Sequence, residues 1–319
     1  VLSDDDIAAE REVVREERRS RVENNPGSQL SEELLAVLYR SHPYGRPVIG
    51  WDHEISALNR IDALEFYNRF YSPNNAILIV AGDVDVEEVR LLAEKYYAPL
   101  ERRAEFGDRQ RPAEPVHRGP RRVSISSERV QQPNVRRMYD VPSYSTAPAG
   151  DAEALDLLAQ ILGGNSSSRL YRRLVIDDQI ATAASAWYSS SGLDSGRFGF
   201  YAAPRGDNGL AQIERSVLEV IDDLKKNGIS EEELARAKTQ LIAEAVYAQD
   251  SQFQLARVFG VALTTGSDVE SVQGWPDRIA GVTVADVRRV AQQYLDDRKS
   301  ATGLLLPGQA APQAKEEGS

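Results

Sequence analysis

Cysteine is absent from this 319-residue chain, and histidine is scarce, with three residues. The lack of cysteine excludes disulfides, thiolate nucleophiles and cysteine-ligated metals, and leaves histidine, aspartate and glutamate to carry any chemistry. It suits an oxidising compartment without requiring one. No apolar run approaches the roughly 20 residues that a membrane-crossing helix needs, so we expect no membrane span in this segment.

Excess positive charge is also absent. The chain carries 49 acidic and 38 basic residues, a net charge of -11, and its arginines are interleaved with acids. Such a surface repels polyanions, so nucleic acid is a poor partner. The content of 41% hydrophobic and 27% charged residues is typical of a globular protein, and the length fits two domains of moderate size.

Composition and periodicity divide the chain into four segments. An exposed linker is expected between Pro99 and Pro120, where arginine, glutamate, proline and glycine replace apolar periodicity. The predicted segments are residues 1–105 as part of a first domain, 106–120 as linker, 121–306 as a second domain, and 307–319 as a disordered tail. The chain starts on Val1 with neither an initiator methionine nor a signal peptide, and we interpret it as cut at its front.

Local patterns predict the helices and strands. In the first segment we expect helices over residues 3–24, 31–40, 61–71 and 86–97, and a central buried strand over the apolar run 76–81. In the second we expect strands over 121–127, 135–141, 183–189, 197–203 and 301–306, and helices over 151–162, 166–174, 210–226, 230–261 with an interruption, and 283–295. The succession of helix, polar turn and apolar strand occurs at 61–82 and again at 283–308, which hints at two domains of related design.

The first predicted helix carries two glutamates on one face. Glu10 and Glu17 are seven residues apart, which is two helical turns, and Ile7, Val13 and Val14 share that face. Carboxylates on a face apolar enough to be packed need compensation, which a bound cation would supply. Alternatively, both lie at the rim of the stripe, solvated or paired with arginines such as Arg21.

Several motifs resemble those of the M16 family, the pitrilysin/insulinase-like zinc metallopeptidases. They occur in the family's order and cover nearly the whole chain: EREVVREE at residues 10–17, HPYGRPVIG at 42–50, FYNRFYSPNNA at 66–76 with VAGD at 80–83, and LGGNSSSRL at 162–170. The resemblance implies an α+β fold of two related α/β domains of the LuxS/MPP-like metallohydrolase type. Each domain would hold a mostly antiparallel sheet with helices packed on one face.

The same resemblance implies a zinc site. By the match to the ERxxVxxE pattern, Glu17 would be the third Zn2+ ligand and Glu10 an acid that orients the site. The family's HxxEH motif, which supplies two histidine ligands and the general base, does not occur. Since it precedes ERxxVxxE in the family, truncation explains its absence, and this fragment should itself be inactive. His42, His53 and His117 are scattered over predicted loops, where we interpret them as surface or capping residues.

A second departure concerns substrate binding. Many relatives have an arginine and a tyrosine, seven residues apart, that grip the substrate backbone. Val175 and Thr182 occupy those positions here and cannot donate as arginine and tyrosine do. This pattern resembles the zinc-bearing member of two-subunit relatives, whose homologous partner subunit supplies the pair; a homodimer is the other arrangement considered.

The resemblance therefore implies a zinc-dependent endopeptidase subunit that acts on peptides or unfolded segments inside a chamber of two halves. A bacterial periplasm is the compartment expected by analogy with the paired relatives. The alternative is a non-catalytic structural or partner subunit of the same fold, like processing-peptidase or respiratory core proteins.

Overall fold

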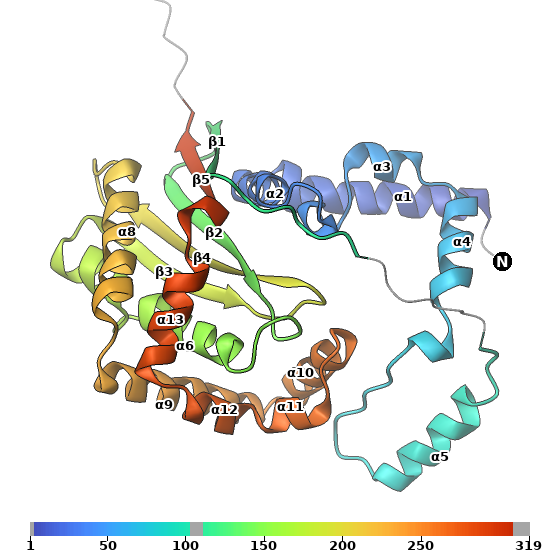
Figure 1. The fold of residues 1–319 in the computed structure, drawn as a ribbon. Helices are drawn as coiled ribbons and strands as arrows, with labels where there is room; N and C mark the ends of the chain where they lie inside the picture. The colour runs from blue at the N-terminus through green and yellow to red at the C-terminus, as the bar shows by residue number, and fades with distance from the viewer. Residues whose placement is uncertain (1–2, 103–110, 309–319) are drawn as a thin grey trace, which may run out of the picture.

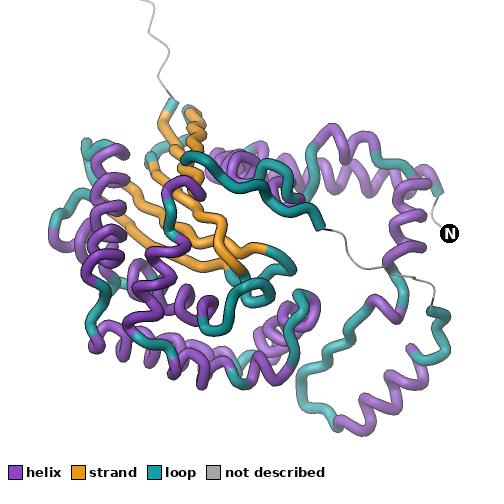
Figure 2. The backbone as a smooth tube through the Cα atoms, in the orientation of Figure 1, coloured by secondary structure: helices purple, strands orange, loops and turns teal. Residues whose placement is uncertain are grey.

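The chain folds as an α+β protein, which confirms the predicted class (Figure 1). The computed structural model describes residues 3–102 and 111–308. Helices alone form the part before residue 100, and a five-stranded sheet with its helices forms the part after residue 120 (Figure 2). Among the described residues, no helix is both long enough and apolar enough to cross a membrane.

The described residues of the first part form five α-helices, and two long connections, residues 39–51 and 71–85, lead from α2 to α3 and from α4 to α5. Helix α1 is extended by a π-helical turn, Arg19–Glu23. Asn59 and Asp85 cap α4 and α5 by accepting backbone N–H groups of the first turn. The helices are α1 (Asp4–Arg18), α2 (Pro26–Leu38), α3 (Asp52–Ala57), α4 (Arg60–Phe70) and α5 (Val86–Tyr97).

Helix α2 begins five residues before its predicted start. The polar stretch after α1 was expected only to end a helix, but it also begins the next one. The Asn25 side chain accepts the backbone N–H groups of Gly27 and Ser28, and Pro26 occupies the first helical turn, where its missing N–H costs nothing.

The sheet has the strand order β1-β5-β2-β4-β3. Strands β2, β4 and β3 are antiparallel neighbours, β2 also pairs antiparallel with β5, and β1 pairs parallel with β5. The last strand in the sequence therefore lies between the first two. The strands are β1 (Arg121–Ser127), β2 (Asn134–Pro142), β3 (Ala181–Ser189), β4 (Ser195–Pro204) and β5 (Ser300–Pro307).

One face of the sheet carries the main core. Alternate residues of the central strands, such as Val135, Tyr139 and Phe198, are fully or almost fully buried against helices α6, α8 and α13. The helices of this part are α6 (Asp151–Gly163), α7 (Arg169–Tyr171, continuing as a π-helical segment Arg172–Asp177), α8 (Leu210–Asn227), α9 (Glu231–Ala248), α10 (Gln252–Thr264), α11 (Val269–Gln273), α12 (Trp275–Gly281) and α13 (Val284–Tyr294).

Helix α2 covers part of the other face of this sheet. Leu34 and Leu38 pack on Met138 and Ala301, and Leu30 lies so close to β5 that a Cβ on Gly303 would be 3.1 Å from its side chain. The helices of the C-terminal part thus pack on one face of the sheet, as expected, and a helix of the N-terminal part covers some of the other face. Helix α2 ties the N-terminal helices to the C-terminal sheet.

The predicted central strand at residues 76–81 is wrong for this structure. The segment is extended, but within the described residues its backbone pairs with no strand, and Ile77, Leu78 and Val80 are about half exposed. Helix α10 lies beside this segment, since a Cβ on Gly260 would lie 3.3 Å from Ile79 Cδ1. An apolar run becomes a buried strand only where a second strand and a covering layer are available.

The segment before β1 is more tightly held than the predicted exposed linker. His117 is buried and the Glu114 side chain is 8% exposed. The Glu114 carboxylate accepts the backbone N–H groups of Arg40, Ser41 and His42 at 2.8–3.0 Å. Residues 103–110 and 309–319 lie outside the described residues. The tail predicted from residue 307 starts too early, because Pro307 ends β5. The division into domains at residues 105 and 121 stays a prediction.

Candidate functional site

Helix α1 places both predicted site glutamates on an open surface. Glu10 is exposed, the Glu17 side chain is 40% exposed, and Val13 between them is 60% exposed. Glu17 forms an ion pair of 2.8 Å with Arg21, which is itself 71% exposed. Ile7 and Val14 on this face are half-buried, but the two carboxylates lie open to solvent, and the argument that they need compensation for burial does not apply.

An adjacent side of α1 is firmly attached. The buried Arg18 forms two hydrogen bonds of 2.9 Å to the Glu32 carboxylate of α2, and it donates to the Gly50 carbonyl at 2.7 Å. Arg15 pairs with Asp52 at the start of α3. These bonds fix the rotation of α1 about its axis, so Glu17, one residue before Arg18, is held on the outward side.

The described residues do not assemble a zinc site. Zinc takes at least three protein ligands from histidine, cysteine or carboxylate groups, and in the described ranges no three such side chains converge. Glu17 offers a carboxylate oxygen of the right chemistry, held by one exposed ion pair. The part of the chain in view can therefore contribute a ligand but cannot close a site by itself.

The side chains at the two positions where relatives have an arginine and a tyrosine offer no substrate-binding group in this structure. Val175 is buried in the main core, between α7 and β3. Thr182 lies at the start of β3, and its hydroxyl is 3.4 Å from the Ala203 carbonyl oxygen on β4. Neither side chain offers a charged or phenolic donor to a substrate.

The three histidines have different surroundings. His53 is exposed on α3. His42 is a capping residue, as predicted: its Nδ1 accepts the backbone N–H of Tyr44 at 3.1 Å, which leaves the proton on Nε2. His117 is buried, and within the described residues neither of its ring nitrogens makes a hydrogen bond.

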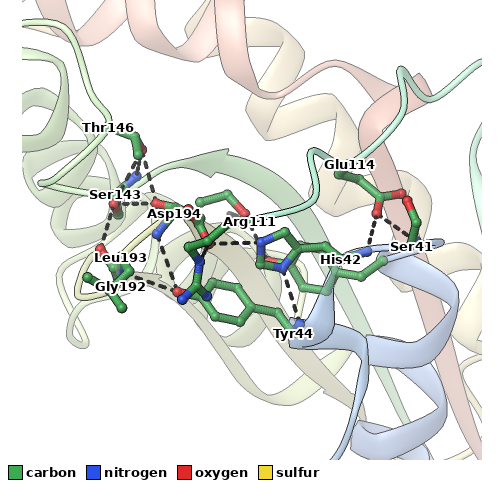
Figure 3. Close-up of polar contacts among 12 residues, drawn as sticks. Ser41, His42, Tyr44, Arg111, Glu114, Ser143, Thr146, Gly192, Leu193 and Asp194 are labelled. Carbon is green, nitrogen blue, oxygen red and sulfur yellow. Dashed lines mark hydrogen bonds and ion pairs between the residues drawn. The ribbon is translucent and has the colours of Figure 1, made fainter. Parts of the chain in front are cut away.

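His42 belongs to a polar cluster that joins three distant segments (Figure 3). Its Nε2 donates to the Asp194 carboxylate at 2.9 Å, and Arg111 forms an ion pair with the same carboxylate. The Tyr44 hydroxyl accepts the backbone N–H groups of Leu193 and Asp194, and the Arg111 guanidinium lies 5.7 Å above the Tyr44 ring. The loop after α2, the segment before β1 and the β3–β4 hairpin meet here.

The hairpin is held from its other side as well. Ser143 Oγ donates to the carbonyls of Gly192 and Asp194, and Thr146 Oγ1 donates to the Asp194 carbonyl at 3.0 Å. Asp194 thus uses its side chain, amide and carbonyl in bonds to different segments. The sequence predicts the two strands of this hairpin but does not single out Asp194, because its partners lie far away in the sequence, from 48 to 152 residues distant.

A second polar cluster lies inside the C-terminal part. The Tyr144 hydroxyl donates to the Asp156 carboxyl at 2.5 Å and accepts the indole N–H of Trp275 at 2.7 Å. Burial raises the pKa of Asp156 to about 7, although hydrogen bonds from Tyr144 and Trp275 lower it. The cluster fastens α12 to the loop between β2 and α6.

Comparison with known proteins shows the same fold in peptidases. The chain superposes on a protease from Helicobacter pylori with a TM-score of 0.88 and 28% identity, covering 96% of this chain and 73% of that one. It superposes on the first half of the periplasmic protease PqqL from Escherichia coli with a TM-score of 0.77 and 20% identity, covering 96% and 67%. The second likeness shows the fold alone.

Sequence comparison points to the same group. The model of the "Peptidase M16 inactive domain" matches residues 57–241. The chain is 29% identical to the zinc protease PqqE of Helicobacter pylori, over 96% of this chain and 68% of that protein. It is 30% identical to an uncharacterized zinc protease of Mycobacterium tuberculosis, over 94% and 67%. The chain belongs to the M16 peptidase family and spans about two thirds of the length of these relatives.

Proposed function

We propose that this chain is the larger part of a zinc-dependent endopeptidase subunit that cleaves peptides or unfolded segments. Membership of the M16 family and likeness to proteins named zinc proteases support this reading. The observation that carries it is Glu17: a carboxylate at the last position of the ERxxVxxE pattern, held on the open side of a rigidly attached helix.

Within this proposal Glu17 is a metal ligand and Glu10, two turns earlier on α1, orients the site from outside the ligand set. The remaining ligands and the general base would come from polypeptide outside the described residues, because those residues bring no three ligands together. A protein made of residues 1–319 alone is therefore expected to hydrolyse no peptide.

A homologous but non-identical subunit is the partner that fits best. A homodimer would place a second Val175 and Thr182 where an arginine and a tyrosine are needed, so it would not supply the missing donors. We extend the proposal to the bacterial periplasm as compartment, by analogy with the paired relatives. Cell fractionation with an antibody to this chain tests the compartment.

The non-catalytic alternative keeps one observation in its favour. The only ion pair of Glu17 among the described residues is with Arg21 on the same helix, which is how an ordinary solvated glutamate behaves. A structural subunit of the M16 fold would show this arrangement and bind no zinc.

Zinc content of the complete protein separates the two functions. We expect about one zinc per chain after dialysis, and its loss in Glu17→Gln, because the amide is a neutral and weaker ligand. Glu10→Gln is expected to weaken zinc binding about tenfold, as changes beside a ligand set commonly do. Atomic emission on dialysed protein measures the stoichiometry, and competition with a chelator measures the affinity.

Glu16→Gln is the matched control, because Glu16 is the exposed neighbour on the same helix and pairs with Arg19. It should keep its zinc and its hydrolysis of a fluorogenic peptide. Zinc-free wild-type protein would favour the structural subunit, and equal zinc in wild type and Glu17→Gln would remove Glu17 from the site.

A further inference from the structure

The loop of residues 42–51 connects the helix that carries Glu17 with the hairpin between β3 and β4. It follows α2 and precedes α3. Its first residues contact the hairpin through His42 and Tyr44 (Figure 3), and its carbonyl at Gly50 accepts from Arg18 on α1. Helix α1 and the hairpin therefore share one connecting segment.

The loop is built to be stiff. Pro43 and Pro47 fix two backbone torsions, and each starts a turn closed by a backbone hydrogen bond, from Arg46 to the Pro43 carbonyl and from Gly50 to the Pro47 carbonyl. A Cβ on Gly45 would lie 3.0 Å from the Tyr39 carbonyl oxygen, so the loop rests directly on the end of α2.

Both ends are fixed by charge-assisted bonds. At the hairpin end, the Asp194 carboxylate binds His42 and Arg111. At the α1 end, Arg18 holds the Gly50 carbonyl while its guanidinium is oriented by Glu32 and lies 5.8 Å above the Trp51 ring. Bonds of this kind are among the stronger polar contacts in proteins.

We propose that the 42–51 loop is a rigid connection between α1 and the β3–β4 hairpin and that Asp194 is a positioning residue. Together they set where α1 and Glu17 lie relative to this hairpin. Shifts at the hairpin are transmitted along the loop to Arg18, the residue after Glu17. The consequence for a metal ligand rests on the proposed function, whereas the mechanical link between the hairpin and α1 does not.

Distance measurement in solution tests the link directly. The chain has no cysteine, so a spin label reacts only with cysteines that are introduced. The double variant Glu16→Cys with Ser191→Cys therefore carries one label on an exposed position of α1 and one on an exposed position of the hairpin. Dipolar spectroscopy is expected to give one narrow distance peak, and addition of Asp194→Ala is expected to broaden it, while α2 still holds α1 near the sheet. A second pair, Asp207→Cys with Ser191→Cys, lies within the C-terminal part and should stay narrow.

Hydrogen exchange gives the second readout. Asp194→Ala should speed exchange about tenfold at residues 18–22 as well as at 42–45, which corresponds to the loss of one charged hydrogen bond. Glu233→Gln is the control, because it breaks the part-buried pair with Arg169 far along the chain and should leave 18–22 unchanged. If Asp194→Ala does not fold, Asp194→Asn, which keeps an oxygen for His42 but loses the charge facing Arg111, is judged by the same criteria.

The proposal is overturned by faster exchange at 42–45 with unchanged exchange at 18–22. It is equally overturned if both label pairs broaden alike, which would locate the change in the hairpin, or if neither pair changes. All of these measurements are made without metal, so a failure of the zinc assignment leaves them interpretable.

Discussion

Residues 121–245 and 275–308 bury most of their apolar side chains, whereas residues 58–102 leave most of theirs exposed. The first region encloses a continuous core between the sheet and its helices. In the second region Ile61, Phe66, Leu91 and Tyr96 are each about half exposed or more. Helices α4 and α5 nevertheless form, because their capping residues act locally. Local signals thus suffice to define a helix, while burial depends on what the rest of the fold provides.

The largest expected difference comes from the same truncation made in both regions. Leu158→Ala in α6 removes a fully buried side chain and should lower the free energy of unfolding by about 3 kcal/mol. Leu91→Ala in α5, where leucine is 54% exposed, should cost less than about 1 kcal/mol. Urea unfolding measures both. Equal losses would show that residues 58–102 are packed in solution.

The close packing of the first region extends to its backbone. A Cβ on Gly163, at the end of α6, would lie 1.9 Å from the backbone nitrogen of Ala186 on β3, so Gly163→Ala must move the helix or the strand. We expect a loss of about 2 kcal/mol. Gly281→Ala, where a Cβ would meet nothing within 4 Å, is the control and should be nearly neutral in the same unfolding experiment.

A smaller, pH-dependent effect is expected at Asp156. The pKa of about 7 in the folded protein exceeds the ordinary 3.8, so folding favours the neutral carboxyl, and stability falls as pH rises from about 4 to 7. Asp156→Asn removes that cost and should stabilise the protein by on the order of 1–2 kcal/mol at pH 8, with the gain shrinking toward pH 4.

Thermal unfolding across this pH range measures the effect, with the exposed Asp207→Asn as control. A gain that does not vary with pH would mean that the substitution improves packing instead of removing a charge.

The sequence predicts most elements of the C-terminal part and fewer features of the N-terminal part. Its strands and long helices follow from alternation and from capping residues, which act within a few positions. The strand predicted at 76–81 failed because six apolar residues specify an extended segment but not its partner. Likewise, ERxxVxxE identified Glu17 as a candidate, but the orientation of α1 depends on Arg18 reaching Glu32 and Gly50, contacts that no local pattern contains.

The position of β5 between β1 and β2 has a consequence for synthesis on the ribosome. Among the described residues, strand β1 has no other neighbour in the sheet, so it stays unpaired until residues 300–307 have been translated. Pairing across such a separation is slow, and nascent chains halted before residue 300 should remain open to protease along β1, whereas β2 can already pair with β4. For this part of the protein, the order of translation delays completion of the sheet until β5 has been made.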